Sequence, residues 1–237
     1  MKDNSISFEI GDSLILLAEL KDDLIDLIFT DPPYNKGKDY GEVSDSKPEK
    51  EFWLFNTEWM FQLHRVLKPG HHFYMTCAHD QIDDFKRIAM DQGFKFRRLL
   101  IWATNECRGH MNARTWLASY EAVLWFQKPG KPYGLFNNYP YAALDVLLYR
   151  SPHRNSKKDK KYHIAQKPLE LVKCIILKSS QEGDLVLDPF LGSGTTLVAC
   201  VETKRKGLGF ELNPEYESII RKRLNGTRVP TSLRRFE

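Results

Sequence analysis

Hydrophobic positions recur along the chain with two different spacings. Apolar or alternating runs that are typical of strands occupy residues 5–10, 24–29, 71–76, 94–102, 120–126, 184–188 and 206–210. Apolar positions at helical spacing occupy residues 14–20, 48–68, 80–92, 168–180, 197–202 and 213–224, and Pro69-Gly70 is expected to end the second of these helices. Strands that alternate with helices predict an α/β fold, with a mostly parallel sheet and helices on both of its faces.

The end of the second expected strand carries the residues around which the rest of the chain is interpreted. Residues 24–29 are followed by Asp31-Pro32-Pro33-Tyr34, which stops the strand and leaves a carboxylate and an aromatic ring at its carboxyl end. Two adjacent prolines remove two amide donors, so carbonyls there can accept hydrogen bonds from another molecule. Ligands bind at this edge of open α/β sheets, although the same residues are also compatible with an ordinary turn.

A second corner of the same kind lies near the carboxyl terminus. A strand ends in Asp188, a turn containing Gly192-Ser193-Gly194 follows, and a helix begins directly afterwards. Glu211 closes the next strand about twenty positions after the glycines, where an acidic residue can bind two ribose hydroxyls. The pattern fits a nucleoside cofactor. It is neither a full dinucleotide fingerprint, because one of three glycines is missing, nor a P-loop, because no lysine precedes the threonine pair.

Length and charge narrow the possible organisation and partners. With 237 residues, we expect a single domain over 1–237, with a mobile loop at about 35–47 and an insertion at about 130–162. A net charge of +4 is compatible with a polyanionic partner without requiring one. Residues 150–161 hold six Lys or Arg against one Asp, which indicates either a phosphate-contacting segment or a solvated charged loop.

The cysteines and the hydropathy pattern argue against several other classes. Cys77, Cys107, Cys174 and Cys200 are far apart and form no Cys-x-x-Cys pair, so we expect reduced thiols and no metal. We find no apolar run of membrane-spanning length and no secretory leader, and therefore expect a soluble, cytoplasmic protein that does not cross a membrane.

Together, DPPY at 31–34 and DPFLGSGTT at 188–196 resemble the motifs of the S-adenosylmethionine-dependent DNA amino-methyltransferases, which modify adenine N6 or cytosine N4. The resemblance covers residues 5–225, and the motif order is similar to that of the circularly permuted β group. It implies a Rossmann-like seven-stranded sheet with one reversed strand, a small target-recognition insertion, and double-stranded DNA as the partner. It also implies a prokaryotic or phage-infected cell, and a homodimer is considered, with residues 133–141 as a contact surface.

The resemblance also implies the site residues. For catalysis these are Asp31, Pro32, Pro33 and Tyr34. For S-adenosylmethionine they are Asp12, Ser13, Asp31, Gln166, Lys167, Asp188, Phe190, Gly192, Ser193, Gly194, Thr195 and Glu211. Asp12, which local sequence alone would make a helix cap, would contact the adenine of the cofactor, and Glu211 its ribose hydroxyls. Gln166 and Lys167 would lie near its carboxylate, in a motif where Ile164 replaces the family's first proline.

The chemistry implied by the resemblance is direct methyl transfer to an amino group. The Asp31 carboxylate and the Pro32 carbonyl would accept the two N–H groups and make the nitrogen more nucleophilic, without a cysteine nucleophile. Tyr34 would stack on the flipped base. DNA contacts are expected from residues 35–46 and 150–161 and from Arg108 and Arg114. The small insertion predicts a short target sequence or weak intrinsic specificity, because few side chains are available to read bases.

The identity of the target remains open between several alternatives. Asp31 favours adenine N6, because serine is commoner at this position in cytosine-N4 enzymes of the family. Cytosine N4, the amino groups of RNA, and a catalytically silent DNA-binding subunit are the alternatives.

Overall fold

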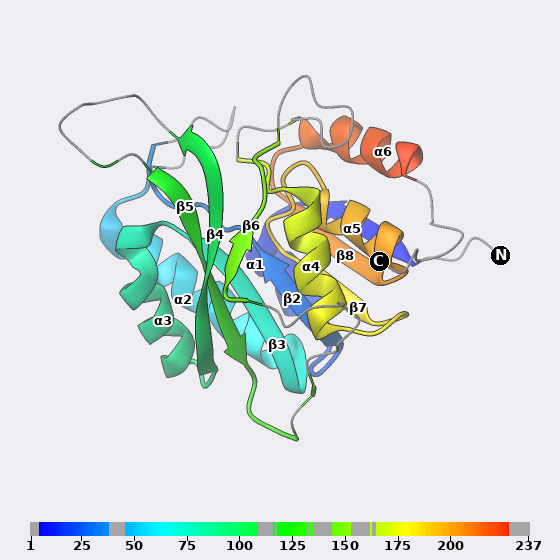
Figure 1. Ribbon diagram of the computed structural model, residues 1–237. Helices are drawn as coiled ribbons and strands as arrows, with labels where there is room; N and C mark the ends of the chain where they lie inside the picture. Colours follow the sequence, from blue (N-terminus) through cyan, green and yellow to red (C-terminus); the bar gives the residue numbers. More distant parts are fainter. Residues whose placement is uncertain are drawn as a thin grey trace.

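The computed structural model describes residues 5–37, 46–108, 116, 118–131, 133–134, 144–152, 162 and 165–227; the side chains of 105–108 are not among the described parts. The elements follow the expected alternation of strands and helices (Figure 1). In chain order they are β1 (Ile6–Ile10), α1 (Ser13–Glu19), β2 (Ile25–Thr30), α2 (Glu49–Val66), β3 (Leu67–Cys77), the 3-10 helix η1 (His79–Gln81), α3 (Ile82–Asp91), β4 (Lys95–Arg108), β5 (Ala118–Gln127), β6 (Val146–Leu148), α4 (Leu169–Ser179), β7 (Leu185–Asp188), α5 (Thr195–Thr203), β8 (Lys206–Glu211) and α6 (Tyr216–Gly226).

The strands form one mixed sheet in the order β1-β8-β7-β2-β3-β5-β4-β6. Strand β5 pairs antiparallel with β3 and β4, and every other pairing in this sheet of described residues is parallel. The mostly parallel sheet with one reversed strand is therefore confirmed. The sheet has eight strands rather than the expected seven, because the three residues of β6 add a short edge strand beside β4.

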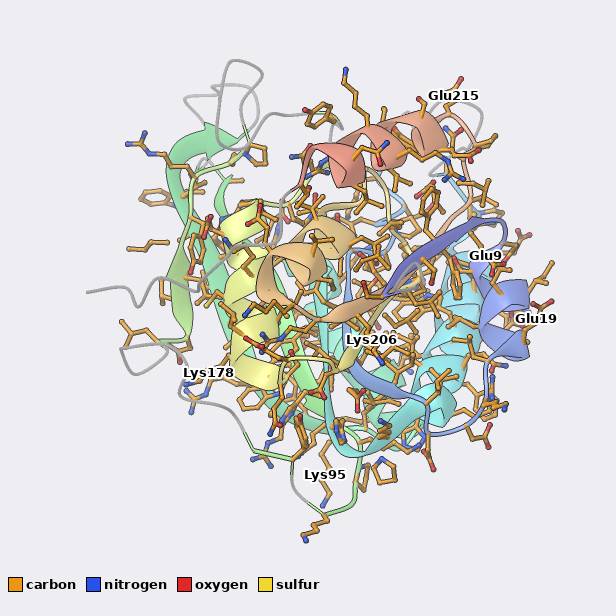
Figure 2. All side chains as sticks on the ribbon, turned by 90° about the vertical axis from the view of Figure 1, so that its right-hand side faces the viewer. Glu9, Glu19, Lys95, Lys178, Lys206 and Glu215 are labelled. Atoms are coloured by element: carbon orange, nitrogen blue, oxygen red, sulfur yellow. The ribbon has the colours of Figure 1, made fainter. Side chains whose placement is uncertain are left out.

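Alternate residues of each central strand pack on opposite faces of the sheet, as the pleat requires. Ile28 belongs to the core shared with α1, α2 and α3, whereas its neighbours Leu27 and Phe29 belong to the core shared with α4 and α5. Figure 1 shows α4 and α5 in front of the sheet and α2 and α3 beyond it. Figure 2 shows the side chains that fill the layers between ribbons, while the exposed Glu9 and Glu19 lie at the margin.

Strand β3 begins earlier than the sequence predicts. Helix α2 ends at Val66, and Pro69-Gly70 lies inside β3 instead of ending the helix. The backbone here meets the segment after β5, since Gly70 N donates to Lys128 O at 3.0 Å. Gly70 has a φ of +83°, and a Cβ at this position would lie 1.7 Å from Lys131 O. The glycine is therefore required by the crossing of two segments that are distant in sequence.

Several predicted features lie wholly or partly outside the described residues. This is the case for 38–45 of the expected mobile loop, for most of the insertion at 130–162, and for Arg114 and 153–161. Arg108 is described only as the last backbone position of β4. Within the described part, no group of three or more His, Cys, Asp or Glu side chains could hold a metal ion, and no helix is long and apolar enough to cross a membrane.

Candidate active site

One cavity of about 420 Å³ is lined by both motifs that the sequence singles out. The adjacent parallel strands β2 and β7 end in them, so their carboxyl ends lie at the same edge of the sheet. Of the predicted site residues, those that line the cavity are Asp12, Ser13, Asp31, Pro33, Gln166, Lys167, Asp188, Phe190, Gly192, Ser193, Thr195 and Glu211. Pro32, Tyr34 and Gly194 are not among its lining residues.

The Asp31 carboxylate accepts hydrogen bonds on both of its oxygens. Oδ1 accepts from the Tyr34 hydroxyl at 2.7 Å and from the Thr76 hydroxyl, which reaches it from the adjacent strand β3. Oδ2 accepts from Lys167 Nζ at 2.5 Å. Burial would raise the pKa of this carboxyl, but the positive charge of Lys167 and these hydrogen bonds outweigh burial and lower it. Asp31 is therefore a fixed, ionised acceptor rather than a strong base.

Tyr34 lies beside this carboxylate in a covered position. Only 7% of the residue is exposed, and Gln81 Nε2 donates to its carbonyl oxygen at 2.7 Å. The ammonium of Lys167 lies 5.6 Å from the centre of the ring. Burial and the nearby negative charge of Asp31 raise the pKa of the phenol well above its usual value, so the hydroxyl stays a donor. Stacking of this ring on a base therefore requires one of its faces to be uncovered.

The glycine turn of the second motif, residues 188–196, contacts Glu211 at the end of β8. Gly192 N donates to Glu211 Oε2 at 2.7 Å, and Asn213 N donates to Oε1 at 2.9 Å. Burial raises the pKa of Glu211, and these amide donors oppose that rise. Gly194, with a φ of +84°, is the residue before the first turn of α5. The turn thereby brings backbone and carboxylate together at the cavity wall.

Asp188 is a buried link between β7 and its neighbours. Its Oδ1 accepts from the Thr30 hydroxyl at 3.0 Å and from Phe190 N at 3.1 Å, and its Oδ2 accepts from the Thr196 hydroxyl at 2.5 Å. Burial raises the pKa of this carboxyl to about 7. The side chain thus ties β2 to the first turn of α5.

Asp12 and Ser13 form the wall contributed by the β1 to α1 corner. Asp12 Oδ1 accepts from Leu14 N at 2.7 Å, so this residue caps α1 and also lines the cavity. The Ser13 hydroxyl donates to Pro189 O at 2.5 Å and joins this corner to the second motif. The capping role expected from local sequence is confirmed, and contact with a cofactor adenine stays a prediction.

Gln166 and Lys167 are both buried at the cavity. Gln166 Oε1 accepts from Tyr162 N at 2.7 Å. Lys167 Nζ makes its contacts with Asp31 and with Glu121 Oε2, at 3.2 Å, so the described structure brings Lys167 to the catalytic motif. The prediction that it contacts the carboxylate of a cofactor is not tested by these contacts.

Sequence reasoning missed several residues that shape the site. Four of them line the cavity, namely Phe29, Phe52, Phe55 and Thr196. The other three contact residues that line it, and they are Thr76, Glu121 and Arg223. Arg223 Nη1 donates to Ser193 O at 2.8 Å and to Thr195 Oγ1 at 3.0 Å, so α6 holds the glycine turn. The ring of Phe55 in α2 contacts the ring of Phe190 in the second motif, and their centroids are 6.0 Å apart.

Comparison with known proteins agrees with this geometry. The chain is 34% identical over 224 residues to the Type II methyltransferase M.HpaI of Haemophilus parainfluenzae, across 88% of this chain and 71% of that one. It is 30% identical over 248 residues to the DNA adenine methyltransferase YhdJ of Escherichia coli (strain K12), across 91% and 81% of the two chains. The crystal structure of the M1.HpyAVI-SAM complex superposes with a TM-score of 0.75 at 28% identity, across 93% of this chain and 99% of that one. The family model for DNA methylase matches residues 25–222, and the chain therefore belongs to the DNA methylase family.

Proposed function

We infer that this chain transfers a methyl group from S-adenosylmethionine to the exocyclic N6 of adenine in DNA. The observation that carries this inference is the cavity that both Asp31 and Glu211 line. Relatives support both halves of the assignment: the solved relative M1.HpyAVI forms a complex with SAM, and the relative YhdJ is named a DNA adenine methyltransferase. Double-stranded DNA as the partner, a prokaryotic cytoplasm and a homodimer are parts of the same proposal.

The residues present fit S-adenosylmethionine. A cavity of about 420 Å³ lies within the size range of small-molecule sites, and its walls combine aromatic rings with a few polar groups. Glu211 would hold the ribose hydroxyls, since its two oxygens already sit at the turn and can accept further hydrogen bonds. Asp12 would hold the adenine, and Phe190 to Thr195 would pass around the methionine part.

When bound, the cofactor supplies an electrophilic methyl group on a sulfonium centre. Asp31 Oδ1 and the Pro32 carbonyl oxygen accept the N–H groups of the target amine and orient its lone pair. Thr76 and Lys167 hold the carboxylate in place while it does so. The proton that leaves the methylated nitrogen departs along the hydrogen bond to Asp31, and no residue of the chain is covalently modified.

Tyr34 completes the proposed base site. An amino group that is paired in a duplex is reached only when the base is flipped out, and an aromatic ring then offers a stacking platform. Such stacking is worth about 1 to 3 kcal/mol per base. The covered position of Tyr34 in this structure indicates that base entry changes the contacts of the ring, including its hydrogen bond to Asp31.

Nucleoside analysis of treated DNA tests the assignment. Wild-type protein and Asp31→Ala are incubated with S-adenosylmethionine and duplex DNA, and digests are analysed by mass spectrometry. We expect N6-methyladenine from the wild type only, with similar cofactor binding to both proteins by calorimetry. Detection of N4-methylcytosine instead would change the proposed target base to cytosine. Methylation of RNA but not of DNA would change the proposed substrate to RNA. A wild type that gives neither product nor heat with the cofactor would indicate a silent subunit.

A further inference from the structure

Lys167 lies between two carboxylates, one of which is the Asp31 of the catalytic motif. Its Nζ is 2.5 Å from Asp31 Oδ2 and 3.2 Å from Glu121 Oε2, and 6% of its side chain is exposed. The carbonyl oxygen of Ala165 lies 3.4 Å from the same nitrogen. Lys167 therefore donates hydrogen bonds to Asp31 and Ala165 and forms an ion pair with Glu121. The charge of Lys167 is therefore directed at Asp31 and Glu121.

The direction of β5 explains why Glu121 is at this site. The parallel strands β2, β7 and β8 bring their carboxyl ends to the cavity, but β5 is antiparallel to β3 and brings its amino-terminal half toward Lys167 and Asp31. Val123 is paired with Thr76, the residue whose hydroxyl donates to Asp31, and Glu121 lies two positions earlier on the same face of β5. Glu121 is thus fixed by the sheet and not by a loop.

Asp31, Lys167 and Glu121 form a triad that is held together by charge. Burial would lower the pKa of Lys167, but Asp31 and Glu121 outweigh burial and raise it, and Lys167 in turn lowers the pKa of Asp31. Because Glu121 also attracts Lys167, it helps to keep the ammonium beside the Asp31 carboxylate.

We propose that Lys167 and Glu121 are positioning residues for methyl transfer, in which Lys167 fixes the Asp31 carboxylate and Glu121 holds Lys167 beside it. The inference rests on the proposed function. As the nitrogen–carbon bond forms and the sulfur–carbon bond breaks, the nitrogen turns positive until its proton leaves. The Asp31 carboxylate, which the triad already holds in place, stabilises this developing charge.

The chain offers a matched control for this triad. On helix α4, which begins two residues after Lys167, Lys173 lies between Glu170 at 3.4 Å and Glu202 at 2.9 Å, and none of these three residues lines the cavity. Glu202→Gln therefore removes the same charge as Glu121→Gln, and Lys173→Met removes the same charge as Lys167→Met. An effect of Glu121→Gln or Lys167→Met that the corresponding control variant does not show is therefore specific to the active site.

Kinetics across pH measure the proposed roles. We expect Glu121→Gln to lower kcat about 10-fold with little change in the KM for S-adenosylmethionine, which is less than the roughly 100-fold loss on removing a group that touches the reacting atoms. Lys167→Met should move the acid limb of the kcat profile upward by about 1 to 3 pH units, the usual effect of losing a neighbouring opposite charge. Glu121→Asp and Lys167→Arg should restore part of each property, and both controls should behave as the wild type.

Titration of the Asp31 carboxyl carbon by NMR gives a readout that needs no reaction. The signal is assigned by its loss in Asp31→Asn, and in Lys167→Met it should titrate at higher pH than in the wild type. An unchanged titration, or an unchanged kcat and acid limb in both active-site variants of an active enzyme, would overturn the proposal. A wild type that methylates no DNA while Asp31 titrates as expected would instead overturn the proposed function and leave the charge coupling supported.

Discussion

Asp188 gives a prediction about stability whose sign can be worked out from its surroundings. Its carboxyl is 4% exposed, and its partners are two hydroxyls and one backbone amide. Burial raises its pKa from 3.8 to about 7 in the folded protein. At a pH between these two pKa values, the carboxyl is ionised in the unfolded chain but still protonated in the folded chain. The stability that this group contributes is therefore fully present at low pH and is lost as the pH rises toward 7.

The substitution Asp188→Asn keeps the shape of the side chain and removes the titration. Its oxygen can still accept from Thr30 and Phe190 N, and its amide can donate to the Thr196 hydroxyl, which can rotate to accept. A pKa difference of about three, at about 1.4 kcal/mol for each unit, corresponds to about 4 kcal/mol for the full effect. Between about pH 5 and about pH 8, the free energy of unfolding of the variant should therefore gain about 3 kcal/mol relative to the wild type.

Urea unfolding of the wild type and Asp188→Asn at a series of pH values measures this difference. Asp84→Asn, at a half-exposed position of α3, serves as the control and should show no change of this size in the free energy of unfolding. Parallel stability curves for wild type and Asp188→Asn would show that the buried carboxyl does not titrate in this range, and would refute the reasoning.

Two further substitutions test contacts that hold the site and the sheet. Arg223→Ala should weaken S-adenosylmethionine binding by about 10-fold in calorimetry, because two hydrogen bonds of Arg223 fix the glycine turn. The control Arg221→Ala, which changes an exposed side chain of the same helix, should bind like the wild type. Equal affinities of the two variants would contradict the role of Arg223. Gly70→Ala should cost about 2 to 4 kcal/mol in urea unfolding, because its φ is +83° and its Cβ would overlap Lys131 O. Gly183→Ala, with a φ of +87° and open space around it, should cost only about 1 to 2 kcal/mol, and similar losses at both glycines would remove the overlap as the cause.

Much of the fold and half of the site could be predicted because both depend on local pattern. Asp31, Asp188 and Glu211 lie at the carboxyl ends of apolar runs, and parallel strands bring such ends to one edge of the sheet. The prediction therefore needed only the strands and their common direction. The short edge strand β6 was missed because three residues are too few to show a period.

Glu121 could not be predicted because its position depends on the exception to that common direction. Glu121 lies at the beginning of a strand, and a search for functional residues at strand ends passes over it. Only the antiparallel pairing of β5 with β3 brings it to the edge where Asp31 lies. Thr76 and Lys167 likewise reach Asp31 from elements that are 45 and 136 residues away in sequence, and no local motif indicates those contacts.

Asp31 and Asp188 show how these tertiary contacts decide the chemistry of one residue type. Both follow buried strands, both line the same cavity, and both accept from threonine hydroxyls, yet the pKa of Asp31 is lowered and that of Asp188 is raised. The donors to Asp188 are uncharged, whereas Asp31 has the ammonium of Lys167 at 2.5 Å. Since burial acts in the same direction on both, the lysine accounts for the difference. An ionised carboxylate is thereby placed where the amine is expected to turn positive, and a carboxyl with a pKa of about 7 lies at the carboxyl end of β7.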